Sequence, residues 1–449
     1  MPNESIDQIS ETLPVSTPEP GSLSRPTGGG NRLRRNIAAL SILQLLNYAL
    51  PIAVIPYLVR VLGPAHYGLL VFAQAAVNYA NSVTDYGFNF SATRLVARHR
   101  DDPSALSRIF WSTVTAKSLL MLLCFAVLAA LIAAVPMFRA QAALLAACSL
   151  LVLGNVLFPM WFFQGMEEMR AITIAQAIAK MSLIPLVFLF VKNQDHFVRA
   201  AALQSGTTVL AGIIGIPLLS KVARLSWYRP SKKDIIESFR EGWDIFVSTV
   251  AITIYTSTNT LVLGFVSGEA QVGYFGAANR IINGSQGVLI PVSQALYPHL
   301  NSMAVKSREA TVALIRKSMF WIALISVSAS LVFFLGAAPI SHLALGRRFD
   351  GSITPLRWMA LLPVLLGLSN VFGVQTMLTF GMNKQFNRIV TTSAVINLLL
   401  TFPFAYFWGA TGAAIAVVLT ELFVTTAMFF AVKSMGLLSA TPISGGEAT

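Results

Sequence analysis

The stretch IFWSTVTAKSLLMLLCFAVLAALIAAV, residues 109–135, contains a single charged side chain, that of Lys117. A helix rises 1.5 Å per residue, so a stretch of this length exceeds the roughly 30 Å of hydrocarbon in a bilayer. The stretch therefore predicts a transmembrane helix.

The same pattern recurs along the chain of 449 residues, of which 55% are hydrophobic and 11% charged. Soluble proteins carry about 25% charged residues, whereas here the charges cluster in short connections between apolar runs. We predict an all-α membrane protein with about twelve transmembrane helices and no sizeable soluble domain. The expected spans are roughly 37–59, 68–90, 109–135, 141–163, 171–191, 198–220, 242–266, 272–297, 313–338, 355–380, 388–408 and 411–432.

Polar segments divide the chain into a predicted order of domains. Residues 1–35 are rich in Ser, Pro, Gly and Glu and are expected to form a disordered cytoplasmic tail without a cleaved signal peptide. An N-terminal six-helix bundle is expected over 36–222 and a C-terminal one over 242–434. A basic cytosolic linker, 223–241, connects them, and 435–449 form a cytoplasmic C-terminal tail.

The distribution of Lys and Arg gives the predicted orientation. With the N-terminal tail inside, these residues are about three times as frequent in the cytosolic segments as in the outer connections, as the positive-inside rule expects. We predict a multi-pass protein of the bacterial inner membrane with both termini in the cytoplasm. Because the net charge of +13 is explained by topology, we expect no nucleic-acid partner.

An internal repeat appears when the sequence is shifted by 205 residues. The second span then falls on the eighth without a gap over about thirty residues, and six apolar or glycine positions are identical, among them Gly63 with Gly268 and Gly68 with Gly273. Polar positions coincide as well: Gln74, Asn78, Asn81 and Asn89 fall on Asn279, Asn283, Gln286 and Gln294. Since six spans separate the copies, both insert in the same sense, which indicates two halves related by an axis along the membrane normal.

The amides of each copy lie along one face of a helix, because their spacing is i, i+4, i+7 and i+15. An amide that faces lipid has no hydrogen-bond partner, so the stripe must face protein or water. Two interpretations remain open. The amides hold helices together, or the two stripes line a shared pathway.

Three cations, Lys117, Lys180 and Arg280, lie deep within predicted spans, whereas Glu421 is the one carboxylate at similar depth. Charges at the bilayer centre cost about 2.5–3.5 kcal/mol and are usually retained for function. The net positive interior suits an anionic substrate, especially a phosphate, which arginine can bind with two parallel hydrogen bonds.

Each of these charges also has a structural alternative. Lys117 and Lys180 have stems long enough to reach the cytosolic headgroups. Arg280 could form an ion pair with Glu421 or Asp85. Asp85, nearer the cytosolic interface, could pair with Arg94 instead of carrying a proton.

Glu421 is the carboxylate expected to bind a coupling ion, since burial favours its protonated form. Asp85 is the second candidate for ion coupling. The chain has no phosphate-binding loop, no cluster of side chains with metal-ligand spacing and no nucleophile elbow. We therefore expect neither a cofactor nor enzymatic activity.

Several motifs resemble those of the polysaccharide transporter family, more narrowly its O-antigen-type flippases, within the superfamily that also contains multidrug exporters and lipid II flippases. The resemblance covers about 31–435. The motifs that carry it are PYLVRVLGPAHYG (56–68), TDYGFNFSATR (84–94), WFFQGMEEM (161–169), GYFGAANRIING (273–284) and PVSQALYPHL (291–300).

The resemblance implies two six-helix bundles in a V-shaped transporter. It also implies that the substrate is a short oligosaccharide on undecaprenyl diphosphate, moved to the periplasmic leaflet with coupling to an ion gradient. Polysaccharide polymerase, chain-length regulator and membrane lipid are the expected partners. Arg280 matches a position that is usually basic in the family. We expect Arg280, with Lys117 or Lys180, to bind the diphosphate. The side chains expected to contact the glycan are those of Asn78, Asn81, Asn279, Asn283 and Gln286.

Two other functions are compatible with parts of the sequence. A multidrug or cation antiporter of the same superfamily requires acidic side chains in its cavity, and only Asp85 and Glu421 are available. A membrane-embedded glycan polymerase or ligase would be expected to present long outer loops, whereas the longest here, about 339–354, is short. A scaffold for glycan assembly is compatible with transport.

Overall fold

The computed structural model describes the backbone of residues 29–434 and the side chains from Val54 onward, apart from short gaps between 248 and 306. These residues are almost entirely helical and contain no β-strand, which confirms the predicted all-α class. The predicted tails fall largely outside the described residues. Helix α1, however, already begins at Gly29, inside the range expected for the N-terminal tail.

The first part of the chain, up to Val222, forms the first helix group. Its elements are α1 (Gly29–Asp85), α2 (Phe88–Arg98), α3 (Pro103–Ala134), α4 (Pro136–Ala140), α5 (Ala142–Leu157), α6 (Met160–Gly165), α7 (Met169–Phe190), the short 3-10 helix η1 (Gln194–His196) and α8 (Phe197–Val222).

The long helix α9 (Lys232–Ser267) follows and contacts α1 and α3 as well as α15. The remaining elements form the second helix group. They are α10 (Glu269–Lys306), α11 (Arg308–Leu335), α12 (Ala337–Ala344), the 3-10 helix η2 (Arg347–Ser352), α13 (Ile353–Met359), α14 (Leu362–Asn370), the π-helix η3 (Val371–Leu378) and α15 (Asn383–Ser434).

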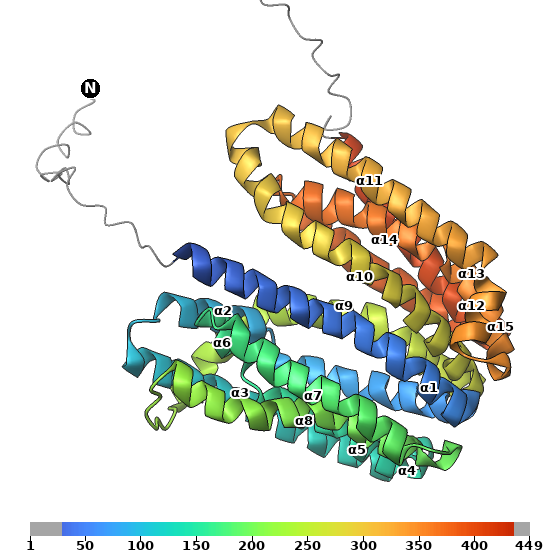
Figure 1. Ribbon diagram of the computed structural model, residues 1–449, viewed down its shortest axis with the longest axis horizontal. Helices are drawn as coiled ribbons and strands as arrows, with labels where there is room; N and C mark the ends of the chain where they lie inside the picture. Colours follow the sequence, from blue (N-terminus) through green and yellow to red (C-terminus); the bar gives the residue numbers. More distant parts are fainter. Residues whose placement is uncertain (1–28, 435–449) are drawn as a thin grey trace, which may run out of the picture.

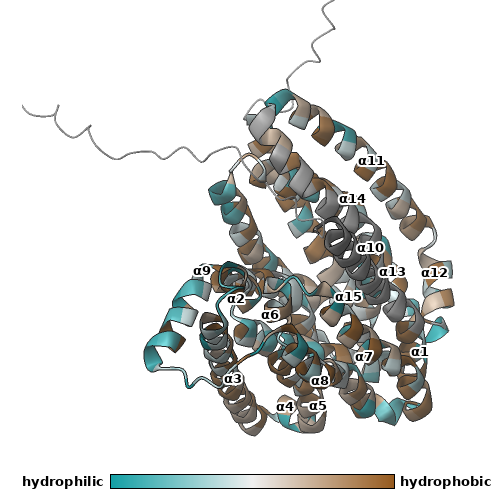
Figure 2. Ribbon diagram, turned by 60° about the vertical axis from the view of Figure 1, so that its left-hand side comes forward, coloured by the Kyte–Doolittle hydropathy of each residue, from teal (hydrophilic) through white to brown (hydrophobic). Residues whose placement is uncertain are grey.

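Eight helical segments of the described residues are long and apolar enough to cross a membrane. The longest, α15, has 52 residues and is interrupted at Gly409, so it exceeds twice the length needed for one crossing. Helices α9 and α10 are not among the eight, and both carry polar side chains into the space between the helix groups. In Figure 2 the long helices are mostly brown, and teal residues gather at helix ends and connections.

The two helix groups converge near α12 and diverge toward the left of Figure 1, where the chain begins. Where they meet, one buried apolar cluster includes residues of both. Leu58 and Leu70 of α1 belong to it, together with Leu263 of α9, Phe275 of α10 and Ala413 of α15. Burial of this shared surface holds the groups together at one end.

The predicted repeat is visible in the backbone. Gly63 interrupts α1 with φ 69° and ψ 174°, and Gly268, which separates α9 from α10, has φ 86° and ψ 172°. Such positive φ angles are accessible to glycine at little cost. The two chain reversals, 205 positions apart, therefore have the same conformation.

The repeat also governs how α1 and α10 contact each other. A Cβ atom at Gly68 would overlap with the carbonyl oxygen of Glu269, and a Cβ at Gly273 would overlap with that of Pro64. Shifting the first pair by 205 exchanges its members for those of the second pair. The contact is thus reciprocal about a local twofold relation, and it requires glycine in both copies.

Helix α9 begins within the segment expected to be a linker. The Ser231 hydroxyl accepts a hydrogen bond from the Asp234 backbone N–H at 3.2 Å, and the Asp234 carboxylate accepts one from the Ser231 N–H at 2.8 Å. This reciprocal cap satisfies two donors at the helix start, and the hydrogen bonds from Ser231 hold the pKa of Asp234 below its usual value. Within the predicted linker, only residues 223–231 are non-helical.

Several predicted spans are broken rather than continuous, and two of them clearly so. The span 141–163 is divided at Phe158 and Pro159 into α5 and α6, since proline cannot donate the helical hydrogen bond. The span 355–380 contains α13, α14 and η3 in succession.

Candidate functional site

A polar cavity of about 410 Å³ lies between the helix groups. Helices α1, α5, α8, α9 and α10 supply its walls, and its polar lining comes from both amide stripes and from neighbouring spans. These polar residues are Gln74, Asn78, Gln204, Ser205, Thr256, Ser257, Thr260, Asn279, Arg280 and Asn283. Two amides of each stripe therefore face one shared space, which favours the interpretation that the stripes line a common pathway.

Hydrogen bonds between α1 and its neighbours fix the first stripe. The Gln74 amide donates to Gln204 Oε1 at 3.1 Å, and the Asn78 amide donates to Ser257 Oγ at 3.1 Å. The hydroxyls of Ser82 and Thr253 lie 2.8 Å apart farther along the same helix pair. Gln74 and Asn78 thus both line the cavity and form hydrogen bonds between helices.

Arg280 is the charged residue in the lining of this cavity. It lies on α10 and its side chain is exposed. Tyr67, on α1, lies close enough to Arg280 to interact with its charge. The Tyr67 ring is buried and packs edge-on against Phe349.

A second cavity, of about 280 Å³, lies within the first helix group. Leu151 lines both cavities, so they are neighbours. The polar lining of the second cavity combines one cation, one carboxylate, amides and hydroxyls. The residues are Asn81, Asp85, Asn89, Asn155, Gln176, Lys180, Thr207 and Thr208.

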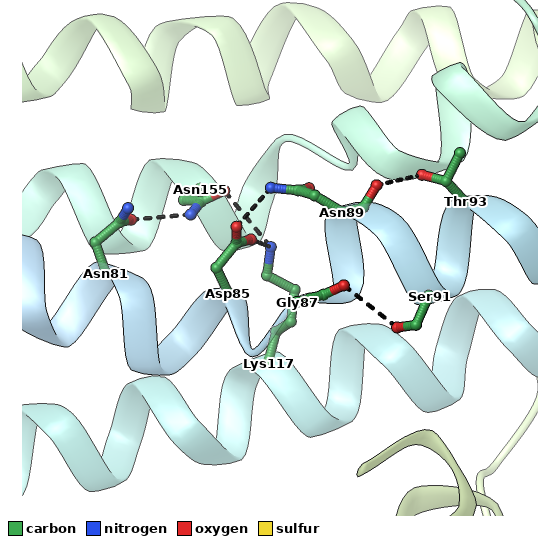
Figure 3. Close-up of polar contacts among 8 residues, drawn as sticks. All are labelled: Asn81, Asp85, Gly87, Asn89, Ser91, Thr93, Lys117 and Asn155. Carbon is green, nitrogen blue, oxygen red and sulfur yellow. Dashed lines mark hydrogen bonds and ion pairs between the residues drawn. The ribbon is translucent and has the colours of Figure 1, made fainter. Parts of the chain in front are cut away.

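A chain of polar contacts crosses the wall of this second cavity (Figure 3). Lys117 Nζ lies 3.0 Å from Asp85 Oδ1 and 3.5 Å from Asn155 Oδ1. The Asn155 amide donates to Asn81 Oδ1 at 2.9 Å, and the Asn89 amide donates to Asp85 Oδ2 at 2.6 Å. The side chains come from α1, α2, α3 and α5, so the network ties four helices together.

The three cations expected to act together are placed apart. Arg280 lines the cavity between the groups and Lys180 lines the cavity within the first group, where its Nζ lies 3.4 Å from Gln176 Oε1. Lys117 is only 1% exposed and lines neither cavity. The position of each cation within its span did not reveal that the side chains point into different spaces.

The structural alternatives for Lys117 and Asp85 can be compared with the observed ion pairs. Lys117 does not extend to the headgroups, because it is buried in its ion pair with Asp85. Arg94 is not the partner of Asp85, since it pairs at 2.8 Å with Glu241 of α9. Asp85 is consequently not available to Arg280.

The remaining expected residues divide in the same way. Asn279 and Asn283 line the cavity between the groups, whereas Asn81 turns into the second cavity and binds Asn155. Glu421 is buried on α15 and belongs to the lining of neither cavity. The side chain of Gln286 lies outside the described residues.

Several lining residues were not anticipated. Asn155, Gln204 and Ser257 have no counterpart in the repeat and were therefore not singled out. Each is nevertheless a polar residue inside an apolar span, and that signal alone marks a candidate for burial against protein.

The ion pair is expected to be worth more to stability than a surface pair. A Lys117→Met variant should lose about 3 kcal/mol of unfolding free energy, because the Asp85 carboxylate would remain in place without its counter-charge. The double variant Asp85→Asn/Lys117→Met should recover most of that loss. Unfolding of the purified proteins in matched detergent measures both, and a single variant as stable as the wild type would contradict the expectation.

Comparisons with known proteins agree with this architecture. Residues 33–304 match the family described as polysaccharide biosynthesis protein. A protein of Escherichia coli strain K12, provisionally named an O-antigen transporter, is 35% identical over 406 residues, covering 90% of this chain and 98% of that protein. A protein of Shigella dysenteriae with the same provisional name is 32% identical over 405 residues, covering 89% and 100%.

Solved structures share the fold. An inward-facing multidrug transporter of the MATE family superposes with a TM-score of 0.71 at 16% identity, covering 91% of this chain and 100% of that one. The lipid II flippase MurJ, in an inward closed conformation, gives 0.70 at 14% identity, covering 90% and 89%.

These relatives are transporters, in agreement with the prediction that the chain is not an enzyme, and the predicted resemblance is confirmed. The family match covers more than half of the chain, and eight of its helices are suited to cross a membrane. The chain therefore belongs to the polysaccharide biosynthesis protein family, as a multi-pass membrane protein with a transporter fold.

Proposed function

We propose that this protein is a flippase that moves an undecaprenyl-diphosphate-linked oligosaccharide from the cytosolic to the periplasmic leaflet for assembly of O-antigen or exopolysaccharide. The observation that carries the proposal is the 410 Å³ cavity between the helix groups, lined by amides of both repeats and by Arg280. Relatives named for O-antigen transport and the fold shared with a lipid II flippase support it.

The cavity matches the physical problem of such a substrate. Sugar hydroxyls and a diphosphate lose their hydrogen bonds to water in hydrocarbon, which costs several kcal/mol for each unpaired polar group. A polar cleft between two helix groups replaces those hydrogen bonds while the polyprenyl tail stays in lipid. The protein therefore lowers the barrier for the headgroup alone.

Each lining residue has a proposed role. Arg280 binds the diphosphate through its two parallel N–H groups, and Lys180 supplies a second positive charge in the adjacent cavity. Asn78, Asn279 and Asn283 contact sugar hydroxyls in the cavity between the groups, and Asn81 and Gln286 are proposed for the same role. Lys117 is not proposed to bind the diphosphate directly. It forms an ion pair with Asp85, which lines the second cavity.

We propose that the helices form two six-helix bundles, 36–222 and 242–434, that rock about their contact at Gly68 and Gly273. The divergence of the groups at one end supports an inward-open conformation. The TM-score of 0.71 with an inward-facing transporter, against 0.53 with an outward-facing one, supports the same assignment.

The setting follows from orientation and coupling. The excess of Lys and Arg on one side supports a location in an inner membrane with both termini in the cytoplasm. The polymerase and the chain-length regulator that use the product are the proposed partners. Of the two carboxylates expected to couple an ion, we retain Glu421, which is buried on α15, because Asp85 is already held by Lys117. A cation exporter of the same fold is disfavoured by the positive charges of Arg280 and Lys180 in the two cavities.

Deletion of the gene tests the proposal. We expect loss of the surface glycan and accumulation of its lipid-linked repeat unit in the cytosolic leaflet, detected by extraction of the lipid and by its protection from an added periplasmic glycosidase. The plasmid-borne wild-type gene should restore export. Loss of glycan without accumulation of the lipid-linked unit would instead indicate a role in synthesis and would refute the proposal.

A further inference from the structure

The ammonium of Lys117 occupies a point on which two side-chain oxygens of the first helix group converge. Asp85 Oδ1 lies 3.0 Å away and Asn155 Oδ1 lies 3.5 Å away. A carboxylate and an amide oxygen that face one point are also the ligands that hard cations such as Na⁺ prefer. The position is therefore chemically a monovalent-cation site that holds a lysine.

The surrounding hydrogen bonds fix these oxygens toward the ammonium. The Asn155 NH₂ group donates to Asn81 Oδ1 at 2.9 Å, so its carbonyl oxygen must face the other way, toward Lys117. Asn89 occupies the second carboxylate oxygen of Asp85 at 2.6 Å. Figure 3 shows the resulting chain from Asn81 to Asn89 with the lysine at its centre.

The negative charge at this position is already neutralised, so it does not attract a mobile cation. Asp85 and Lys117 cancel, and Lys180 adds a positive charge to the same cavity. A dissociable Na⁺ would have to displace an ammonium that is tethered to α3 and only 1% exposed. Because a tethered group loses no translational freedom on binding, the free ion competes at a disadvantage.

We infer that Lys117 is a tethered cation that fills the monovalent-cation site of the first helix group, so that this half binds no Na⁺ and any driving ion binds elsewhere. The second clause rests on the proposed transport function, whereas occupancy of the site does not. Removal of the lysine beyond Cβ would leave the Asp85 carboxylate facing a cavity that admits water, and so would create a Na⁺ site.

Equilibrium binding to the purified full-length chain tests the inference. Melting temperature and binding of ²²Na⁺ are measured in NaCl and in N-methylglucamine chloride at equal ionic strength. For the wild type we expect no response to Na⁺. For Lys117→Ala we expect a Na⁺-dependent rise of about 2 °C or more and near-stoichiometric binding, both absent from Asp85→Asn/Lys117→Ala.

Two further measurements separate the position from general effects. Lys180→Ala removes a lysine that lines the second cavity but leaves Lys117 in its ion pair with Asp85. The melting temperature of this variant should not respond to Na⁺. Propylammonium replaces the deleted atoms of Lys117→Ala, so it should raise the melting temperature of that variant and compete with Na⁺.

Wild-type protein that binds Na⁺, with the binding lost in Asp85→Asn, would overturn the inference, even where Lys117→Ala yields no folded protein. Folded Lys117→Ala without a Na⁺ response, or Lys180→Ala with an equal one, would do the same. Glycan export by the wild type is scored separately. Normal export with Na⁺ bound at Asp85 overturns only this inference, and absent export without Na⁺ binding overturns only the flippase proposal.

Discussion

An Arg280→Ala variant is expected to export no detectable surface glycan while remaining folded in the membrane. Arg280 is the charged group in the lining of the cavity between the helix groups, and its exposed side chain leaves the fold little dependent on it. Two charge-assisted hydrogen bonds to a diphosphate are worth about 3 kcal/mol or more, which corresponds to at least a hundredfold in affinity. Glycan on the cell surface, normalised to membrane-inserted protein, measures the effect.

Two matched variants make the Arg280 result specific. Arg280→Lys keeps the charge but loses the planar pair of donors, so partial export is expected. Arg139→Ala removes an exposed arginine of α4 that lines neither cavity. This variant should export glycan normally. Normal export by Arg280→Ala would remove the central residue of the proposed mechanism.

The double variant Gly68→Ala/Gly273→Ala is expected to leave the conformation described here and to lose most transport. Each new Cβ would overlap with a backbone carbonyl, of Glu269 or Pro64, that cannot rotate away as a side chain can. Overpacking typically costs about 1–3 kcal/mol per site, so about 4 kcal/mol for both shifts a two-state equilibrium nearly a thousandfold. The helix groups should then separate at this contact and approach each other at the opposite end.

Distances between the helix groups report this shift. Spin labels at the exposed positions Arg98, at the end of α2, and Arg308, at the start of α11, should move closer together in the double variant. The native Cys124 and Cys148 are first replaced by alanine. Gly206→Ala, where a Cβ meets no atom within 4 Å, should leave the distances and transport unchanged. An unaltered distance distribution in Gly68→Ala/Gly273→Ala would show that the contact does not control the conformation.

Local pattern and repetition were sufficient to predict much of the fold. Apolar stretches such as 109–135 appear as long helices because a bilayer demands both length and satisfied backbone groups. The shift of 205 residues identified two equivalent helices, α1 and α10, but not their contact at Gly68 and Gly273, which is visible only in the structure. The π-helix within 355–380 was not predicted, because it depends on packing between helices rather than on the residues themselves.

The candidate site was predictable as a surface but not as a set of contacts. The amide stripe indicated a polar face of the helix. Asn78 and Asn81 nevertheless line different cavities, because residues three positions apart on a helix point in directions about 60° apart. The pairing of Lys117 with Asp85 depends on how α3 is rotated against α1. The position of a charged residue within a span gives its height in the membrane but not the direction of its side chain. The sequence therefore did not exclude Arg94 as the ion-pair partner of Asp85.

The reciprocal glycine contact resembles an isologous interface, the kind that two identical subunits form about a dyad. A homodimer of such subunits would carry identical walls on both sides of its cavity. Fusion into one chain removes that constraint: Arg280 corresponds by the 205-residue shift to Ala75, and both residues line the same cavity. Covalent fusion thereby allows a cation on one wall where the other wall has none, and this asymmetry would give an amphiphile with one anionic end a defined orientation between the two walls.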